Sequence, residues 1–210
     1  MLTIQNFQKK YPGNTQPVLS INQFEIETGI YWIKGENGSG KTTLLKSIAG
    51  MIPFEGSITV SGLQLSANRM DYTRIVNYAE AEPRYPNFLT GKELIDFYRA
   101  TKKGDFPGTL LEALGVEKFM HQKTATYSSG MLKKLSLVLG FTGSAKLLML
   151  DEPLIALDVA AVEVLHATIR QYSEKGISFI ITSHQPLNNV LMAGTTTLLL
   201  TEKTLRQQNA

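Results

Sequence analysis

Residues 35–42 read Gly35-Glu36-Asn37-Gly38-Ser39-Gly40-Lys41-Thr42 and match the phosphate-binding pattern GxxxxGK(S/T) at every fixed position. An apolar run over residues 30–33 precedes the stretch, and a helical pattern over residues 43–49 follows it. Glycines let the backbone N–H groups of such a loop point inward, and the helix N-terminus beyond it favours anions. A glycine-rich turn with a solvated lysine is the alternative. The flanking elements favour a phosphate-binding loop, here called the P-loop, in which Lys41 reaches the β- and γ-phosphates and Thr42 ligates Mg²⁺.

The composition is that of a folded protein. Of 210 residues, 43% are hydrophobic and 19% are charged, which suits one large domain or a domain with a subdomain. The net charge is only +3 and no block of like charge occurs, so nucleic-acid binding is not indicated. The chain has no cysteine, which excludes disulfides and thiolate metal sites.

The chain shows no targeting or membrane-spanning segment. Residues 1–7 lack a basic and apolar leader pattern, and no apolar run approaches the roughly 20 residues that span a bilayer. The longest candidate, Leu187 to Leu200, is interrupted by asparagines, a glycine and threonines. We therefore expect a soluble, cytoplasmic protein.

Alternating strand and helix patterns predict an α/β fold with a mostly parallel central sheet. We expect strands at residues 2–7, 18–26, 30–34, 57–60, 75–78, 146–150 and 177–182, and helices at residues 42–49, 92–101, 107–114, 130–141 and 159–174. The strands at 2–7, 18–26 and 57–60 suggest a small antiparallel layer. We expect one domain over residues 1–210, with a core formed by 1–82 and 146–210 and an inserted helical subdomain over 83–145.

A second chemical motif follows the apolar strand at 147–150. Asp151 and Glu152 stand directly at its carboxyl end. In phosphoryl-transfer ATPases an aspartate at this place holds Mg²⁺, and a following glutamate can act as general base toward the attacking water. Two solvated acids at a strand end are the alternative, which the P-loop upstream disfavours.

Over nearly its whole length the chain resembles the ATP-binding subunits of ABC transporters. Gly35–Thr43 resembles the Walker A motif, and Leu147–Glu152, followed by Pro153, resembles Walker B. Tyr127-Ser128-Ser129-Gly130-Met131 is similar to the LSGGQ signature, with Tyr, Ser and Met replacing Leu, the first Gly and Gln. The resemblance implies a set of ATP-binding residues: Asn37, Gly38, Ser39, Gly40, Lys41, Thr42, Thr43, Ser128, Ser129 and Gly130. Without the other motifs, an ordinary helix N-cap would be the preferred interpretation of Ser128–Gly130.

Three further segments carry the resemblance. Ala156-Leu157-Asp158 matches the D-loop, where the aspartate organises a dimer interface, although Ile155 replaces a small polar residue. His184, after the strand at 177–182, matches the switch histidine, and a neutral imidazole there can bond the γ-phosphate and orient water. Tyr11 stands where the family stacks an aromatic ring on adenine; a turn aromatic that covers the core is the alternative.

The clearest departure concerns the Q-loop, whose glutamine contacts Mg²⁺ and the attacking water in the family. This chain reads Ala79-Glu80-Ala81-Glu82-Pro83, with Ala81 at the nearest aligned position. We favour Glu82 as the substitute metal ligand, with Glu80 as second choice, because a carboxylate can ligate Mg²⁺ as an amide carbonyl does. A solvated glutamate remains the alternative, so the departure affects the expected hydrolysis rate more than ATP binding.

The resemblance implies an ATPase that uses ATP and Mg²⁺. This chain would form a head-to-tail dimer with itself or with a paralogous ATPase chain, and two ATP molecules would be sandwiched between the two chains. An integral membrane permease subunit would complete an exporter-like transporter, with this chain on the cytoplasmic face of the membrane and no nucleic acid as partner. Tyr85, Phe88 and Leu89 are candidates for the docking groove, or else they pack the helical subdomain.

Two other function classes remain. A soluble ABC ATPase that acts on nucleic acid or ribosomes usually carries coiled coils or tandem units, which this chain lacks. A catalytically weak partner in a heterodimer is suggested by the departures at Ile155, Ala81 and Ser129, whereas intact Glu152 and His184 argue against it.

Overall fold

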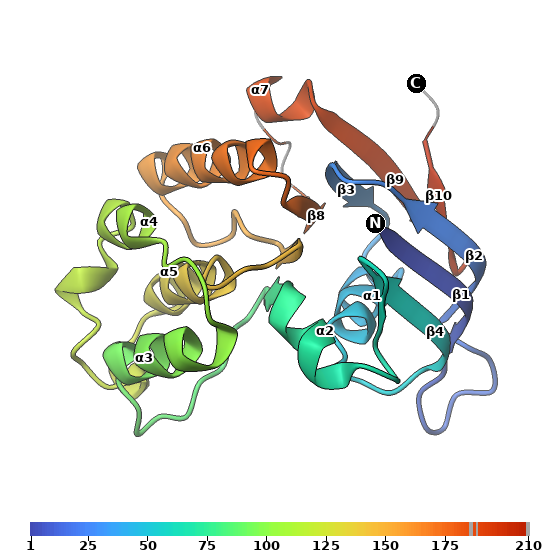
Figure 1. Cartoon of the computed structure of the whole chain (residues 1–210), viewed down its shortest axis with the longest axis horizontal. Coiled ribbons are helices and arrows are strands. Elements are labelled where there is room, and N and C mark those ends of the chain that lie inside the picture. Colours follow the sequence, from blue (N-terminus) through green and yellow to red (C-terminus); the bar gives the residue numbers. More distant parts are fainter. Residues whose placement is uncertain (185–186, 188, 209–210) are drawn as a thin grey trace.

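The computed structural model describes residues 1–184, 187 and 189–208 (Figure 1). Its strands are β1 Leu2–Lys9, β2 Leu19–Ile26, β3 Ile30–Lys34, β4 Glu55–Val60, β5 Leu63–Gln64, β6 Val76–Ala79, β7 Leu147–Asp151, β8 Ser178–Thr182, β9 Thr195–Thr201 and β10 Thr204–Gln207. Its α-helices are α1 Lys41–Ile48, α2 Arg69–Ile75, α3 Gly91–Lys102, α4 Gly108–Ala113, α5 Ser129–Gly140, α6 Val159–Glu174 and α7 Asn189–Met192. Two short 3₁₀ turns, Val116–Lys118 and Thr124–Thr126, join α4 to α5.

The central sheet has six strands in the order β10-β9-β3-β8-β7-β6. Its neighbouring strands are parallel except for β10, which pairs antiparallel with β9. Every residue of β7 and β8 is buried, as expected for strands covered on both faces. Their register pairs Asp151 with Thr182, and Thr182 also pairs with Ile33 of β3. The carboxyl ends of three strands therefore meet at one edge, where ligands bind in open α/β sheets.

A second sheet has four antiparallel strands in the order β2-β1-β4-β5. Along β1 and β2, Leu2, Ile4, Leu19 and Ile21 are buried. These side chains share one apolar cluster with Leu44 and other residues of α1, and with residues of β3, β7 and β8. Helix α1, which follows the P-loop, is thus held by apolar packing that includes both sheets.

Helices α3, α4 and α5 fill the chain between β6 and β7 and lie on the other side of the central sheet from β1, β2 and β4 (Figure 1). Helix α5 is the most enclosed of the three: Leu135, Leu137, Val138 and Leu139 are all buried. They belong to a cluster that also contains residues of α4, α6, β7 and β8. The helical region consequently shares a core with the sheet.

The α/β fold class is confirmed, while several elements differ from the sequence-based expectation. The strand expected from residue 75 begins at Val76, because Arg69–Ile75 forms the unpredicted helix α2. Strands β5, β9 and β10 were also missed, and β9 overlaps the end of the run from Leu187 to Leu200 that was considered only as a possible membrane span. β-branched threonines open β9, which is a strand signal that its leucines obscured. Among the described residues, no helix is long and apolar enough to cross a membrane.

Candidate active site

The P-loop joins β3 to α1, and its backbone leaves the start of α1 open. Gly38 and Gly40 adopt left-handed φ angles of 80° and 103°, which glycine tolerates without strain. Helix α1 has no side-chain cap at its N-terminus and no acidic residue in its first turn. Its first N–H groups and positive dipole end therefore suit an anion such as a nucleotide phosphate.

Lys41 lies against its own loop. Its Nζ atom donates hydrogen bonds to the carbonyl oxygens of Gly35, at 2.8 Å, and Glu36, at 3.0 Å. The buried Ser39 hydroxyl has no hydrogen-bond partner among the described residues. These groups give the loop a cation and an unused donor, both of which suit phosphate oxygens.

Residues from four segments line one pocket of about 250 Å³ at the mouth of the P-loop. Predicted site residues from Walker A and Walker B and the switch histidine are among them: Asn37, Gly38, Gly40, Lys41, Thr42, Thr43, Asp151, Glu152 and His184. The fold thus brings the predicted phosphate, metal and general-base residues into one cavity.

Asp151 is oriented by two hydroxyl donors. The carboxylate is 1% exposed, and it accepts hydrogen bonds from Thr182 Oγ1 at 2.6 Å and from Tyr78 Oη at 2.9 Å. Burial, followed by the nearby Asp151 charge, raises the pKa of Tyr78 far above its usual range, so the phenol stays a donor. Both donors fix the orientation of the Asp151 carboxylate, as a metal ligand requires.

Glu152 and His184 face each other across the pocket. The His184 backbone N–H donates to Glu152 Oε2 at 3.1 Å, and His184 Nε2 lies 3.4 Å from Glu152 Oε1. Glu152 Oε1 is buried and has no hydrogen-bond partner among the described residues. Glu152 also adopts a left-handed φ of 46°, a conformation that is strained for a non-glycine residue and common at catalytic sites. An unsatisfied carboxylate oxygen beside an imidazole suits a general base that receives a proton from water.

The Q-loop residues line an adjoining pocket of about 430 Å³ together with Thr42 and Asp151. Glu80 and Glu82 both border this pocket, and Glu80 Oε2 lies 3.2 Å from Lys46 Nζ. The described residues contain no group of three or more His, Cys, Asp or Glu that could hold a metal alone. A Mg²⁺ here would accordingly need Thr42 and phosphate oxygens besides Asp151 and a Q-loop carboxylate, which is the usual binding mode of this ion.

Tyr11 lies beside the start of α1. Its hydroxyl is 3.3 Å from Thr43 Oγ1, its ring is 4.6 Å from Lys9 Nζ, and it is 38% exposed. This exposure disfavours the alternative of a turn aromatic that covers the core. An exposed ring next to a phosphate-binding loop suits stacking on a base.

The signature residues lie away from the P-loop pocket. Ser128 and Gly130 line a pocket of about 660 Å³ together with Asp158. The Ser128 hydroxyl caps α5 by accepting from the Met131 N–H at 3.2 Å, so the N-cap role is present. Asp158 caps α6 through the Ala161 N–H at 2.8 Å and pairs with Lys134 at 3.0 Å, and both contacts lower its pKa. Ser128, Ser129 and Gly130 are therefore not part of the P-loop pocket within one chain.

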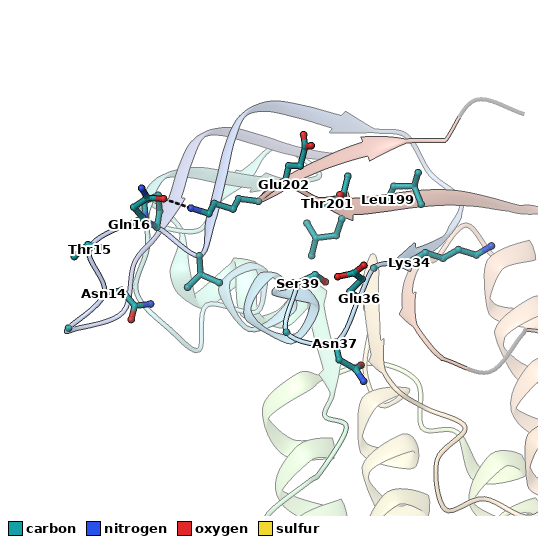
Figure 2. A pocket seen from close by; sticks show the side chains of 17 residues that line it. Asn14, Thr15, Gln16, Lys34, Glu36, Asn37, Ser39, Leu199, Thr201 and Glu202 are labelled. Atoms are coloured by element: carbon teal, nitrogen blue, oxygen red, sulfur yellow. Dashed lines mark hydrogen bonds between the residues drawn. The ribbon is translucent and has the colours of Figure 1, made fainter.

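A cavity of about 980 Å³ borders the other side of the P-loop, which the sequence did not predict (Figure 2). Residues 13–18, residues 34–39 and the β9–β10 hairpin line it, and Gln16 Oε1 accepts a hydrogen bond from Lys203 at 2.7 Å across its rim. Because β9 and β10 were not predicted from the sequence, the cavity wall that they form beside the P-loop was not predicted either. Tyr78, which is the penultimate residue of β6, and Thr182, which ends β8, were also missed.

The proposed docking residues behave differently from one another. Phe88 is 72% exposed, whereas Tyr85 and Leu89 are partly buried against the core. Only Phe88 of the three is thus free of core packing in the structure.

Comparison with known proteins identifies the class of the chain. Residues 19–155 match the model of the ABC transporter family. The chain is 33% identical over 190 residues to the uncharacterized ABC transporter ATP-binding protein YybJ of Bacillus subtilis (strain 168), covering 88% of this chain and 85% of YybJ. It is 30% identical to the lantibiotic transport ATP-binding protein SrtF of Streptococcus pyogenes, covering 88% and 80%. It is also 30% identical to the tungstate uptake system ATP-binding protein TupC of Peptoclostridium acidaminophilum, covering 86% and 85%.

A solved structure supports the fold assignment. A dimeric ATP-binding cassette in a post-hydrolysis state, bound to ADP and Pi, superposes with a TM-score of 0.81 at 20% identity and covers 100% of this chain and 98% of its own. The chain belongs to the ABC transporter family and is an ATP-binding cassette, an ATPase of that family.

Proposed function

We propose that the chain hydrolyses Mg²⁺-ATP as one half of a head-to-tail dimer that powers transport through a separate membrane subunit. The observation that carries the proposal is the separation of the two half-sites: the P-loop, Asp151 and His184 line one pocket, whereas Ser128 and Gly130 line another. A second chain related by a two-fold axis supplies the missing half to each site. ATP then acts as the contact between the chains.

Each residue has a defined task in this proposal. The N-terminus of α1 and Lys41 bind the β- and γ-phosphates, and Tyr11 stacks on adenine. Thr42 and Asp151 would hold Mg²⁺, together with Glu82 or, as second choice, Glu80, and the bound ion would neutralise phosphate charge. His184 orients water for attack on the γ-phosphorus. Glu152 Oε1 takes a proton from this water as the water oxygen bonds to the γ-phosphorus. The bond between the γ-phosphorus and the β–γ bridging oxygen breaks, which leaves ADP and inorganic phosphate.

The partner chain contributes Ser128, Ser129 and Gly130 at the γ-phosphate, with Asp158 at the interface. Because hydrolysis removes the γ-phosphate from the joint contact, the closed dimer loses stability relative to the open one. This difference in stability between the closed and the open dimer then drives transport. Phe88, exposed next to the Q-loop, is our candidate contact with a permease on the cytoplasmic face of the membrane.

Export is the direction that we propose. The Tyr-Ser-x-Gly-Met signature and the segment Pro86-Asn87-Phe88-Leu89-Thr90 resemble those of exporter cassettes. SrtF is named for lantibiotic transport, whereas TupC is named for tungstate uptake. Reconstitution with its permease in vesicles would decide the direction from the side on which substrate accumulates.

The test compares the native chain with Glu152→Gln for ATP-dependent dimerisation and phosphate release. We expect the native chain to turn over ATP and Glu152→Gln to form a stable ATP-bound dimer with turnover reduced at least about 100-fold. A native chain that dimerises on ATP but releases no phosphate, alone or with its permease, would instead support a catalytically weak subunit. The alanine at position 81 is the observation that favours that second candidate.

A further inference from the structure

Lys133 is a buried lysine that connects three parts of the active site. It lies on α5, is 2% exposed, and donates from Nζ to three backbone carbonyls. The acceptors are Glu80 O at 2.8 Å, Ala81 O at 3.3 Å and Asp151 O at 2.9 Å. One ammonium group therefore holds two Q-loop residues and the main chain of the metal-binding aspartate to the signature helix.

Burying the Lys133 ammonium group costs free energy, and the need to fill space in the core does not by itself explain a lysine at this position. Lys133 makes no ion pair with a carboxylate among the described residues, and burial lowers its pKa to about 8. A buried ammonium loses hydration that only its hydrogen bonds offset, and an apolar side chain of similar volume would fill the same space without that loss. What the ammonium adds is directional geometry, with three carbonyls converging on one atom.

Lys133 lies close to the signature end of α5. Ser128 caps the helix, and Lys133 follows five residues later, roughly 7.5 Å along the axis at about 1.5 Å per residue. The capped end faces the γ-phosphate bound by the partner chain, while Lys133 contacts the Q-loop and Asp151 of its own chain. Tyr85, in the segment after the Q-loop, also packs against the apolar cluster that contains Leu135 and Leu139 of α5, which adds a second link between that segment and the helix.

We propose that Lys133 is a positioning residue that transmits the state of the signature end of α5 to the Q-loop and Asp151, and so couples the two ATP sites of the dimer. The coupling part rests on the proposed head-to-tail dimer. Since an α-helix is stiff over five residues, a shift of the signature end displaces Lys133 and the three carbonyls together. Lys133 itself is not among the residues that line the P-loop pocket or the Q-loop pocket.

Lys102 provides a matched control. Lys102 is partly buried, and burial lowers its pKa to about 8, as it does for Lys133. It donates to the carbonyls of Thr73 and Val76, again across the boundary between the helical region and the core. Its acceptors lie outside the pockets of the active site. Lys102→Met therefore removes a comparable carbonyl clamp without touching the Q-loop or Asp151.

The experiment compares Lys133→Met, Lys133→Arg and Lys102→Met with the native chain. ATP affinity is measured by calorimetry in the Glu152→Gln background, turnover as kcat with its dependence on ATP concentration, and Q-loop mobility as hydrogen exchange of residues 79–83. For Lys133→Met we expect kcat to fall roughly 10- to 100-fold, as for other groups that orient metal ligands, with ATP affinity within about twofold of native. We also expect faster exchange at 79–83 and a Hill coefficient that drops from above 1 to 1.

Lys133→Arg should recover part of kcat, and Lys102→Met should lower the thermal midpoint while kcat per folded molecule stays within about twofold. Unchanged exchange at 79–83, or equal losses of kcat in the two Met variants, would overturn the positioning role. A native Hill coefficient of 1 would overturn the coupling between sites. If the native chain does not dimerise with ATP, the proposed dimer is wrong. The hydrogen-exchange measurement at residues 79–83 still decides whether Lys133 orders the Q-loop.

Discussion

The N-termini of α1 and α5 differ in whether a side chain caps their first N–H groups. Helix α1 begins after a glycine loop with no side-chain cap, so its N–H groups are available. Helix α5 begins with Ser128, whose hydroxyl already satisfies the Met131 N–H. The N-terminus of α1 is therefore open to a ligand, whereas the N-terminus of α5 is already capped by a side chain of the same chain. In the head-to-tail dimer that we propose, this difference would explain why one chain binds ATP and a second chain completes the site.

The largest effect should come from removing the cation of the open terminus. Lys41→Ala deletes the Nζ that now bonds Gly35 and Glu36 and that we assign to the phosphates. Charge-assisted hydrogen bonds contribute about 1.5–3 kcal/mol each, so we expect ATP affinity to fall about 100-fold, measured by calorimetry in the Glu152→Gln background. An unchanged affinity would show that the N–H groups of α1 suffice without the lysine.

Tyr78→Phe tests the metal side of the same pocket. The change removes one of two hydroxyl donors to Asp151 and leaves the Thr182 donor in place. We expect the Mg²⁺ concentration for half-maximal turnover to rise roughly 10-fold. Tyr72→Phe is the control, because its hydroxyl donates to the Ile48 carbonyl, outside the active site, and should leave the Mg²⁺ dependence unchanged.

Ser128→Ala tests the capped terminus and separates its two roles. Loss of the cap should destabilise the chain by about 1 kcal/mol in urea unfolding, and loss of the hydroxyl should raise the ATP concentration needed for dimerisation several-fold. ATP binding to the monomer should not change. Thr90→Ala removes the equivalent cap of α3 and should match the loss of stability without affecting dimerisation. Equal dimerisation by both variants would mean that Ser128 is only an N-cap.

The smallest effect concerns α6, whose capped start borders the signature pocket. His166 is 5% exposed, neither ring nitrogen has a hydrogen-bond partner among the described residues, and burial lowers its pKa. Because the unfolded chain binds the proton more readily, this residue's contribution to stability is present above about pH 6.5 and declines as the pH falls below it. His166→Leu should therefore show a shallower loss of thermal stability in acid than native protein. Parallel curves for the two proteins would contradict the assignment.

Much of the site could be read along the chain, because its phosphate-binding part is local. Residues 37, 38 and 40–43, the two acids at the carboxyl end of β7 and the histidine after β8 were all predicted as site residues, and they line one pocket. The parallel strands explain why these residues lie together, since the carboxyl ends of such strands meet at one edge of the sheet. Helix α2 and the β9–β10 hairpin were missed because their patterns are short or resemble a continuous apolar run.

The sequence alone determined the chemistry: a glycine loop before a helix, a lysine and threonine within it, and two acids and a histidine at strand ends. Tertiary structure decided which groups orient these residues. Tyr78 and Thr182 meet Asp151 across 73 and 31 residues, and Lys133 meets the Q-loop carbonyls across 53 and 52. Such contacts depend on strand register and on the packing of α5 against the sheet, whereas sequence periodicity reports only which face of an element is buried.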